Sequence, residues 1–254
     1  MKYSLHFLNS NKKKIEILQE LPDKGDKFPT ILLVPGFGMD LHEYGFFDEA
    51  SVVLVRNGFQ TFRFSFEGTG KSQGNFTEMT VESQVQQLRD VINFITKDRF
   101  VDKSRVAIFA QSYGTVVTTI SMPLPEIKTL AYTSAPHDPY TSLSKWFKRE
   151  RGFDPVGESV INRSDGRKTR IGPKFWESLQ KFNLISEIKK VTQPILLIHG
   201  SFDQRVPILE AEDLYLAVQG RKKLHIVEKA DHAFTGRFRL PVLKLIAQWF
   251  LEEL

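Results

Sequence analysis

The chain has 254 residues, of which 41% are hydrophobic, a size and composition that suit one α/β domain with a substantial core. It contains no cysteine, which excludes disulfides, thiolate nucleophiles and cysteine-ligated metals. The net charge is only +5, no apolar run approaches a membrane span, and the first residues lack the apolar core of a signal peptide, so we expect a cytoplasmic protein.

Before residue 96, short apolar runs of strand length alternate with longer stretches whose apolar residues recur at helical spacing. The predicted elements are strands at 3–8, 14–21, 30–34 and 59–66, and helices at 46–54 and 81–95. Thr80 stands directly before the second helix, and its hydroxyl is expected to cap the helix N-terminus.

The same alternation continues after residue 96, with one interruption. The predicted elements are strands at 106–110, 129–133, 195–199 and 224–227, and helices at 115–120, at 208–218 and from Pro241 onward. Strands linked by helices predict a mostly parallel central sheet with helices on both faces, which is an α/β fold.

The interruption, residues 137–185, has no clear strand but carries aromatic residues around Trp146, Phe153 and Phe175-Trp176. It holds ten Lys or Arg against six Asp or Glu, and ten minus six gives a local charge of +4. An insertion near the carboxyl ends of the strands predicts a lid on a single domain of residues 1–254. Its charge suggests the hypothesis that acidic substrates are favoured, although a solvated surface accounts for it as well.

Residues 105–119 read RVAIFAQSYGTVVTT and carry the most informative motif. An apolar strand runs into Ser112 and a helix leaves it, so the serine lies at a tight strand-to-helix turn. Ala110 and Gly114 stand two residues before and after it, where only small side chains fit. This is the G-x-S-x-G nucleophile elbow with alanine as the first small residue, and it makes Ser112 the candidate nucleophile.

A serine hydroxyl needs a base, and the base needs an orienting acid. His232 follows the last predicted strand, where a loop can bring it over the edge of the sheet, whereas His42 is a weaker competitor. Asp203 follows the preceding predicted strand within four residues, and Asp138 is its main rival. The order serine, acid, histidine along the chain favours Asp203 and His232 as partners of Ser112.

The negative charge that develops on a substrate's carbonyl oxygen needs N–H donors. Tyr113 follows the candidate nucleophile at a helix N-terminus, so its backbone N–H is one candidate. The turn Gly36-Phe37-Gly38 follows the strand at 30–34, and its glycines allow the N–H of Phe37 to point inward as the second.

Four motifs together resemble the α/β-hydrolase family of serine hydrolases: VPGFG at 34–38, FAQSYG at 109–114, HGSFDQRVP at 199–207 and ADHAF at 230–234. Within it the chain is similar to small esterases of the cinnamoyl and feruloyl esterase group, with monoacylglycerol-lipase-like and serine-aminopeptidase-like members as near neighbours. The resemblance implies Ser112 as nucleophile, His232 as base, Asp203 as its partner, and Phe37 and Tyr113 as oxyanion donors.

The chain departs from the family pattern beside these residues. Pro35 stands where many members have a histidine that buttresses the oxyanion turn. Gln111 replaces the usual histidine or glutamate before the nucleophile, Ala110 replaces the first elbow glycine, and Thr115 replaces a second glycine after the elbow. None of these changes removes a catalytic atom.

Other functions are less well supported. Residues 65–72 end in GTGKS, but Ser65 replaces the first glycine of the phosphate-binding P-loop, and the family carries a Gly-rich turn here. The lid's basic residues are interleaved with acids, which disfavours a basic stripe for nucleic acid. No cluster has metal-ligand spacing and a hydrolytic triad needs no metal, so no metal or cofactor is expected.

We therefore expect a serine hydrolase that cleaves small-molecule carboxylic esters through an acyl-enzyme on Ser112. Thioesters are an alternative substrate, as are the amides of a serine aminopeptidase-like enzyme. A non-catalytic binding module on the same fold is a further alternative, because a fold does not by itself determine a function.

Overall fold

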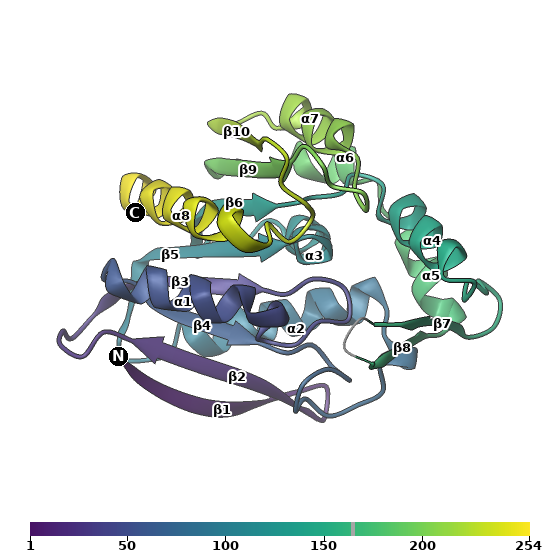
Figure 1. The fold of residues 1–254 in the computed structure, drawn as a ribbon. Coiled ribbons are helices and arrows are strands. Elements are labelled where there is room, and N and C mark those ends of the chain that lie inside the picture. Colours follow the sequence, from purple (N-terminus) through teal and green to yellow (C-terminus); the bar gives the residue numbers. More distant parts are fainter. Residues whose placement is uncertain (164–165) are drawn as a thin grey trace.

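The computed structural model describes residues 1–163 and 166–254, and its centre is an eight-stranded sheet of order β1-β2-β4-β3-β5-β6-β9-β10 (Figure 1). Strand β2 pairs antiparallel with β1 and β4, and every pair from β4 to β10 is parallel, which confirms the predicted α/β sheet. The strands are β1 (Lys2–Ser10), β2 (Lys13–Leu21), β3 (Phe28–Val34), β4 (Gln60–Phe64), β5 (Val101–Gln111), β6 (Ile127–Thr133), β9 (Ile195–Gly200) and β10 (Lys222–Val227).

Strand β3 contributes to a core on each face of the sheet. Ile31 and Leu33 join one core cluster and Leu32 and Val34 the other, because successive side chains of a strand point to opposite faces. The first face is covered by α1 (Phe46–Arg56) and α8 (Arg239–Glu253), and the second by α2 (Val81–Ile95), α3 (Tyr113–Ser121), α6 (Leu184–Ile188) and α7 (Ile208–Ala217). Burial on both faces explains why β3 reads as an uninterrupted apolar run.

Most predicted strands have ends that differ from those in the structure, and β5 and β4 show why. Strand β5 begins at Val101, five residues before the predicted start at Val106. The prediction missed these residues because 102–105 are polar and lie at the more exposed start of the strand. Strand β4 ends at Phe64 rather than Phe66 and begins after Phe59, whose N–H still bonds to the carbonyl of Leu54 in the last turn of α1. An apolar run therefore marks the buried part of a strand and not its hydrogen-bonded limits.

The segment between β6 and β9 (residues 134–194) contains α4 (Pro139–Arg149), β7 (Ser159–Asn162), β8 (Lys168–Ile171) and α5 (Pro173–Leu179), followed by α6. The expectation of no strand in 137–185 is wrong, because β7 and β8 form an antiparallel pair. Each has four residues and buries only alternate ones, so its apolar pattern is too short to recognise. Figure 1 shows α4, α5 and this hairpin beyond the carboxyl ends of the parallel strands.

The order of the strands places the candidate site. After β3, the chain adds β4 on one side and β5 on the other, so the direction of strand addition reverses between β3 and β5. In open α/β sheets a ligand binds in the crevice at such a switch point, outside the carboxyl ends of the strands. The turn that follows β3 begins at Pro35, and Ser112 follows β5 directly.

Three short 3-10 helices complete the described elements: η1 (Glu43–Gly45), η2 (Phe76–Glu78) and η3 (Gly236–Phe238). Within residues 1–163 and 166–254, no helix has both the length and the apolar character needed to cross a membrane.

Thr80 caps α2 as predicted. Its side chain accepts the N–H of Ser83 at 3.1 Å, and the Ser83 hydroxyl accepts the N–H of Thr80 at 3.0 Å. We expect Thr80→Ala to lower the free energy of unfolding by about 1 kcal/mol, because the N–H of Ser83 loses its partner. Thr80→Ser keeps a hydroxyl at this position and should retain most of this stabilisation. Urea denaturation monitored by circular dichroism measures both changes, and an alanine variant as stable as the wild type would contradict the assignment.

Candidate active site

Ser112 occupies a strained turn between β5 and α3. Its φ of 50° lies in the left-handed region that non-glycine residues rarely adopt, and its N–H donates to the carbonyl of Thr133 at 2.8 Å. A Cβ at Gly114 would lie 2.6 Å from the carbonyl oxygen of Pro35, so only glycine lets α3 start this close to the end of β3. The elbow predicted from the small residues around Ser112 therefore has a steric cause.

Two hydrogen bonds connect Ser112 to His232 and His232 to Asp203. The distance from Ser112 Oγ to His232 Nε2 is 2.9 Å, and that from His232 Nδ1 to Asp203 Oδ2 is 2.7 Å. His232 lies in the loop after β10, and Asp203 lies in the loop after β9. The structure thus brings together three side chains that the sequence places up to 120 residues apart.

The surroundings of Asp203 fix its charge. Its side chain is 0% exposed, and its second oxygen accepts the N–H groups of Arg205 and Val206 at 2.8 and 3.0 Å. Burial raises the pKa of the Asp203 carboxyl, but the hydrogen bond and charge of His232 and the N–H of Val206 outweigh it and hold the pKa below its ordinary value. An ionised carboxylate only accepts, so His232 carries its proton on Nδ1 and presents a bare Nε2 to the hydroxyl of Ser112.

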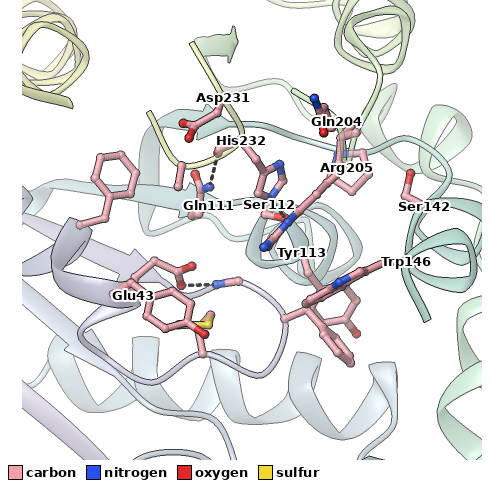
Figure 2. A pocket seen from close by; sticks show the side chains of 18 of the residues that line it. Glu43, Gln111, Ser112, Tyr113, Ser142, Trp146, Gln204, Arg205, Asp231 and His232 are labelled. Carbon is pink, nitrogen blue, oxygen red and sulfur yellow. Dashed lines mark hydrogen bonds between the residues drawn. The ribbon is translucent and has the colours of Figure 1, made fainter. Parts of the chain in front are cut away.

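The backbone of His232 is anchored by the last residue of β5 and by the residue that follows β6. Gln111 Nε2 donates to the carbonyl oxygen of His232 at 3.0 Å (Figure 2), and Ser134 Oγ donates to the same oxygen at 2.9 Å. The Gln111 side-chain oxygen in turn accepts the hydroxyl of Thr133. The glutamine that departs from the family pattern therefore holds the loop of the candidate base in place.

The rival candidates have other partners. Asp138 caps α4 by accepting the N–H of Thr141 at 2.9 Å. His42 is exposed and pairs with Asp48 at 2.8 Å. His199 is fully buried and donates from Nε2 to the carbonyl of Val206 at 2.9 Å, and burial lowers its pKa, so it stays neutral. None of the three contacts Ser112.

The two predicted oxyanion donors lie on neighbouring elements. Phe37 is in the turn after β3 and Tyr113 is the first residue of α3, and their rings meet edge to face at 5.7 Å between centroids. In the described part of the chain, neither backbone N–H donates a hydrogen bond to another protein group. Both residues line the cavity above Ser112.

A cavity of about 760 Å³ opens over Ser112 and His232. In Figure 2, Glu43 and Trp146 lie on opposite sides of Ser112, and Arg205 reaches toward it from above. Its apolar lining includes Phe37, Leu143, Trp146 and Val206, and its charged lining includes Glu43, Arg149, Arg163 and Arg205. A ligand at Ser112 therefore meets both apolar surface and charged side chains.

Sequence reasoning did not identify Glu43, a carboxylate that lines this cavity. Its Oε2 accepts the N–H of Gly36 at 2.7 Å. Burial raises the pKa of Glu43 to about 7, although the N–H of Gly36 and the positive charge of Arg163 act to lower it. Only tertiary structure brings Glu43 to this turn, and no motif marks it.

Four of the ten basic residues counted at 137–185 form ion pairs within the described part of the chain. Arg149, Arg170 and Lys181 contact Glu150, Glu158 and Glu82, respectively, and Arg167 contacts Asp40. Asp165, one of the six acids counted there, lies outside the described residues. These pairs weaken the hypothesis that a local charge of +4 selects acidic substrates.

The GTGKS turn is filled by the protein's own groups. Glu16 accepts the N–H of Lys71 at 2.8 Å, and the Ser72 hydroxyl donates to the carbonyl of Ser65 at 2.6 Å. A P-loop would direct such backbone N–H groups to a phosphate. The turn therefore binds a side chain of β2, which carries Glu16.

A model of the prolyl oligopeptidase family of peptidases matches residues 46–254. The chain belongs to the prolyl oligopeptidase family. It is a serine hydrolase with the α/β-hydrolase fold, as the four motifs indicated.

Solved structures share the fold of this chain, and curated relatives match parts of it in sequence. The structure of Est1E from Butyrivibrio proteoclasticus with bound ferulic acid superposes with a TM-score of 0.82, at 21% identity over 98% of both chains. The esterase domain of a Rhodothermus marinus protein superposes with a TM-score of 0.73, at 23% identity over 98% of both chains. The uncharacterized peptidase YuxL of Bacillus subtilis (strain 168) is 23% identical over 89% of this chain and 35% of its own length. The curated relatives are longer, and the chain covers 23% to 57% of their lengths.

The raised pKa of Glu43 predicts a pH-dependent stability. From pH 4.5, its ordinary pKa, to about 7, the unfolded chain has released this proton while the folded protein still holds it, so the wild type loses stability as pH rises. Glu43→Gln keeps an acceptor for Gly36 and does not ionise. We expect the free energy of unfolding of Glu43→Gln to equal that of the wild type near pH 4 and to exceed it at pH 8 by at most about 3 kcal/mol. Urea denaturation across this range tests the prediction, and a constant difference between the two proteins would contradict it.

Proposed function

We propose that this protein is a serine esterase that cleaves carboxylic esters of small molecules through an acyl-enzyme on Ser112. The observation that carries the proposal is the pair of hydrogen bonds from Ser112 to His232 and from His232 to Asp203, at a cavity of about 760 Å³. A hydroxyl, a base and an orienting acid in this order are the requirements for nucleophilic acyl transfer.

In the first half of the reaction, Ser112 Oγ attacks the ester carbonyl while its proton passes to His232 Nε2. The carbonyl oxygen gains the negative charge and accepts from the N–H groups of Phe37 and Tyr113. The tetrahedral intermediate then breaks its bond to the alcohol oxygen, which takes the proton from His232. In the second half, water gives a proton to His232 and attacks the acyl-enzyme, and Ser112 Oγ recovers that proton as the carboxylic acid leaves. Asp203 stays ionised and stabilises the imidazolium throughout.

Esters are the first choice of substrate because the esterase structures share the whole fold and part of the cavity wall is apolar. Family membership and the likeness to YuxL favour a second candidate, an aminopeptidase-like cleavage of amides. The two reactions share the acyl-enzyme and differ in the leaving group, since an amine must be protonated before it leaves.

We also propose that the β6–β9 segment serves as the lid of this site. Its helix α4 contributes Leu143, Trp146 and Arg149 to the cavity wall, and β7 is followed by Arg163, which also lines the cavity. Ser142 Oγ and the N–H of Asp138 both bond to the buried carboxylate of Glu210 on α7, which fixes the segment where it leaves the sheet.

Labelling with a fluorophosphonate probe and hydrolysis of p-nitrophenyl butyrate test the mechanism. We expect Ser112→Ala to abolish both signals, and Asp203→Asn to reduce kcat by about 10⁴-fold because His232 loses its required tautomer. Ser104→Ala is the matched control, since Ser104 is an exposed serine near the start of the same strand. A wild-type protein that neither takes the label nor hydrolyses the ester would instead be a binding module.

The substrate class is tested with p-nitrophenyl esters of increasing chain length, methyl ferulate, a monoacylglycerol, a thioester and an aminoacyl p-nitroanilide. We expect kcat/KM for the best ester to exceed that for the p-nitroanilide. The reverse order would replace the esterase by the aminopeptidase-like enzyme and leave the Ser112 mechanism intact.

A further inference from the structure

The turn at residues 35–39 carries one of the proposed oxyanion donors, and its sequence allows several conformations. Gly38 adopts a φ of +64°, and the N–H of Met39 bonds weakly to the carbonyl of Gly36 at 3.2 Å. Pro35 provides neither a side-chain hydrogen bond nor a backbone N–H. Other groups must therefore fix the peptide plane between Gly36 and Phe37, which carries the N–H proposed as an oxyanion donor.

Glu43 holds the peptide before that plane. Its carboxylate accepts the N–H of Gly36, which belongs to the peptide that joins Pro35 and Gly36. Glu43 and Tyr44 both have positive φ, at 47° and 53°, so the backbone is strained where it directs this side chain at the turn.

Arg163 holds the peptide after that plane. Its Nη2 donates to the carbonyl oxygen of Phe37 at 2.7 Å, and its Nε donates to the hydroxyl of Thr169 on β8 at 2.8 Å. The guanidinium also lies 4.9 Å from the ring centre of Trp146. With the residue only 7% exposed, these contacts fix a group whose burial is otherwise costly.

We propose that Arg163, which the hairpin of the β6–β9 segment delivers to the turn after β3, is a positioning residue for the oxyanion donor of Phe37. Arg163 and Glu43 fix the peptides on both sides of the Gly36–Phe37 plane. The inference rests on the proposed acyl-enzyme mechanism. It assigns to the segment a part in catalysis beyond covering the cavity.

The test compares Arg163→Met with Arg170→Gln, which removes a positive charge from the same hairpin at an exposed ion pair with Glu158. We expect Arg163→Met to lower kcat for p-nitrophenyl butyrate at least tenfold with KM changed less than about twofold, because a displaced donor stabilises only the transition state less well. In an alkyl trifluoromethyl ketone, Ser112 Oγ adds to the carbonyl carbon, and the former carbonyl oxygen becomes an oxyanion. The affinity for this inhibitor should fall by a similar factor. The affinity for butyrate should not change. Arg170→Gln should match the wild type, and Arg163→Lys should recover part of kcat.

Circular dichroism and thermal unfolding accompany each variant. If Arg163→Met does not fold, Thr169→Val replaces it, since it removes the hydroxyl that orients the guanidinium, and the same split between kcat and KM is expected. A folded variant with unchanged kcat, or one that loses butyrate and trifluoromethyl ketone affinity equally, overturns the inference. Retention of hydrolysis by Ser112→Ala would instead refute the proposed function itself.

Discussion

The close contact between α3 and the end of β3 is the constraint on which the rest of the site depends. Gly114 brings the backbone of α3 against the carbonyl groups of Val34 and Pro35, where any side chain would overlap with both. The chain reaches this contact only by turning sharply at Ser112, which explains the positive φ of that residue. The same contact places the N–H of Tyr113 beside the turn that carries Phe37. The positions of the proposed nucleophile and of the proposed oxyanion donors thus follow from one packing contact.

The side chains of Asp203 and His199 are fully buried, and their surroundings set their charge. Asp203 loses its exposure to water but gains two backbone N–H groups and the N–H of His232, so it remains ionised. His199, 3.4 Å away, responds to burial in the opposite way and remains neutral. Two buried groups in contact therefore differ in charge, because the hydrogen bonds of Asp203 outweigh its burial, whereas the one from His199 to the carbonyl of Val206 does not.

The β6–β9 segment contributes differently from what its composition indicated. Its excess of basic residues drew attention to substrate charge, yet several of them form ion pairs with nearby acids. Arg163 makes a different contact, because it is buried and directed inward to the backbone of Phe37. The segment's aromatic residues divide in the same manner. Phe147, Phe175 and Trp176 pack into the core, while Trp146 faces the cavity.

The sequence by itself determined the α/β fold and the identities of Ser112, Asp203 and His232 as candidates. Both depend on local chemistry: a parallel sheet buries continuous apolar runs, an elbow requires small residues around its serine, and each candidate lies within a few residues of the end of a strand. Tertiary structure alone decided which distant groups support them. Gln111 reaches the backbone of His232 across 121 residues, and Arg163 reaches that of Phe37 across 126. Such contacts leave no periodic pattern in the chain, because they are set by how the loops fold over the sheet and not by the spacing of residues. The short strands β7 and β8 escaped recognition for a related reason, since a four-residue strand with two buried side chains is stabilised by its surroundings more than by its own sequence.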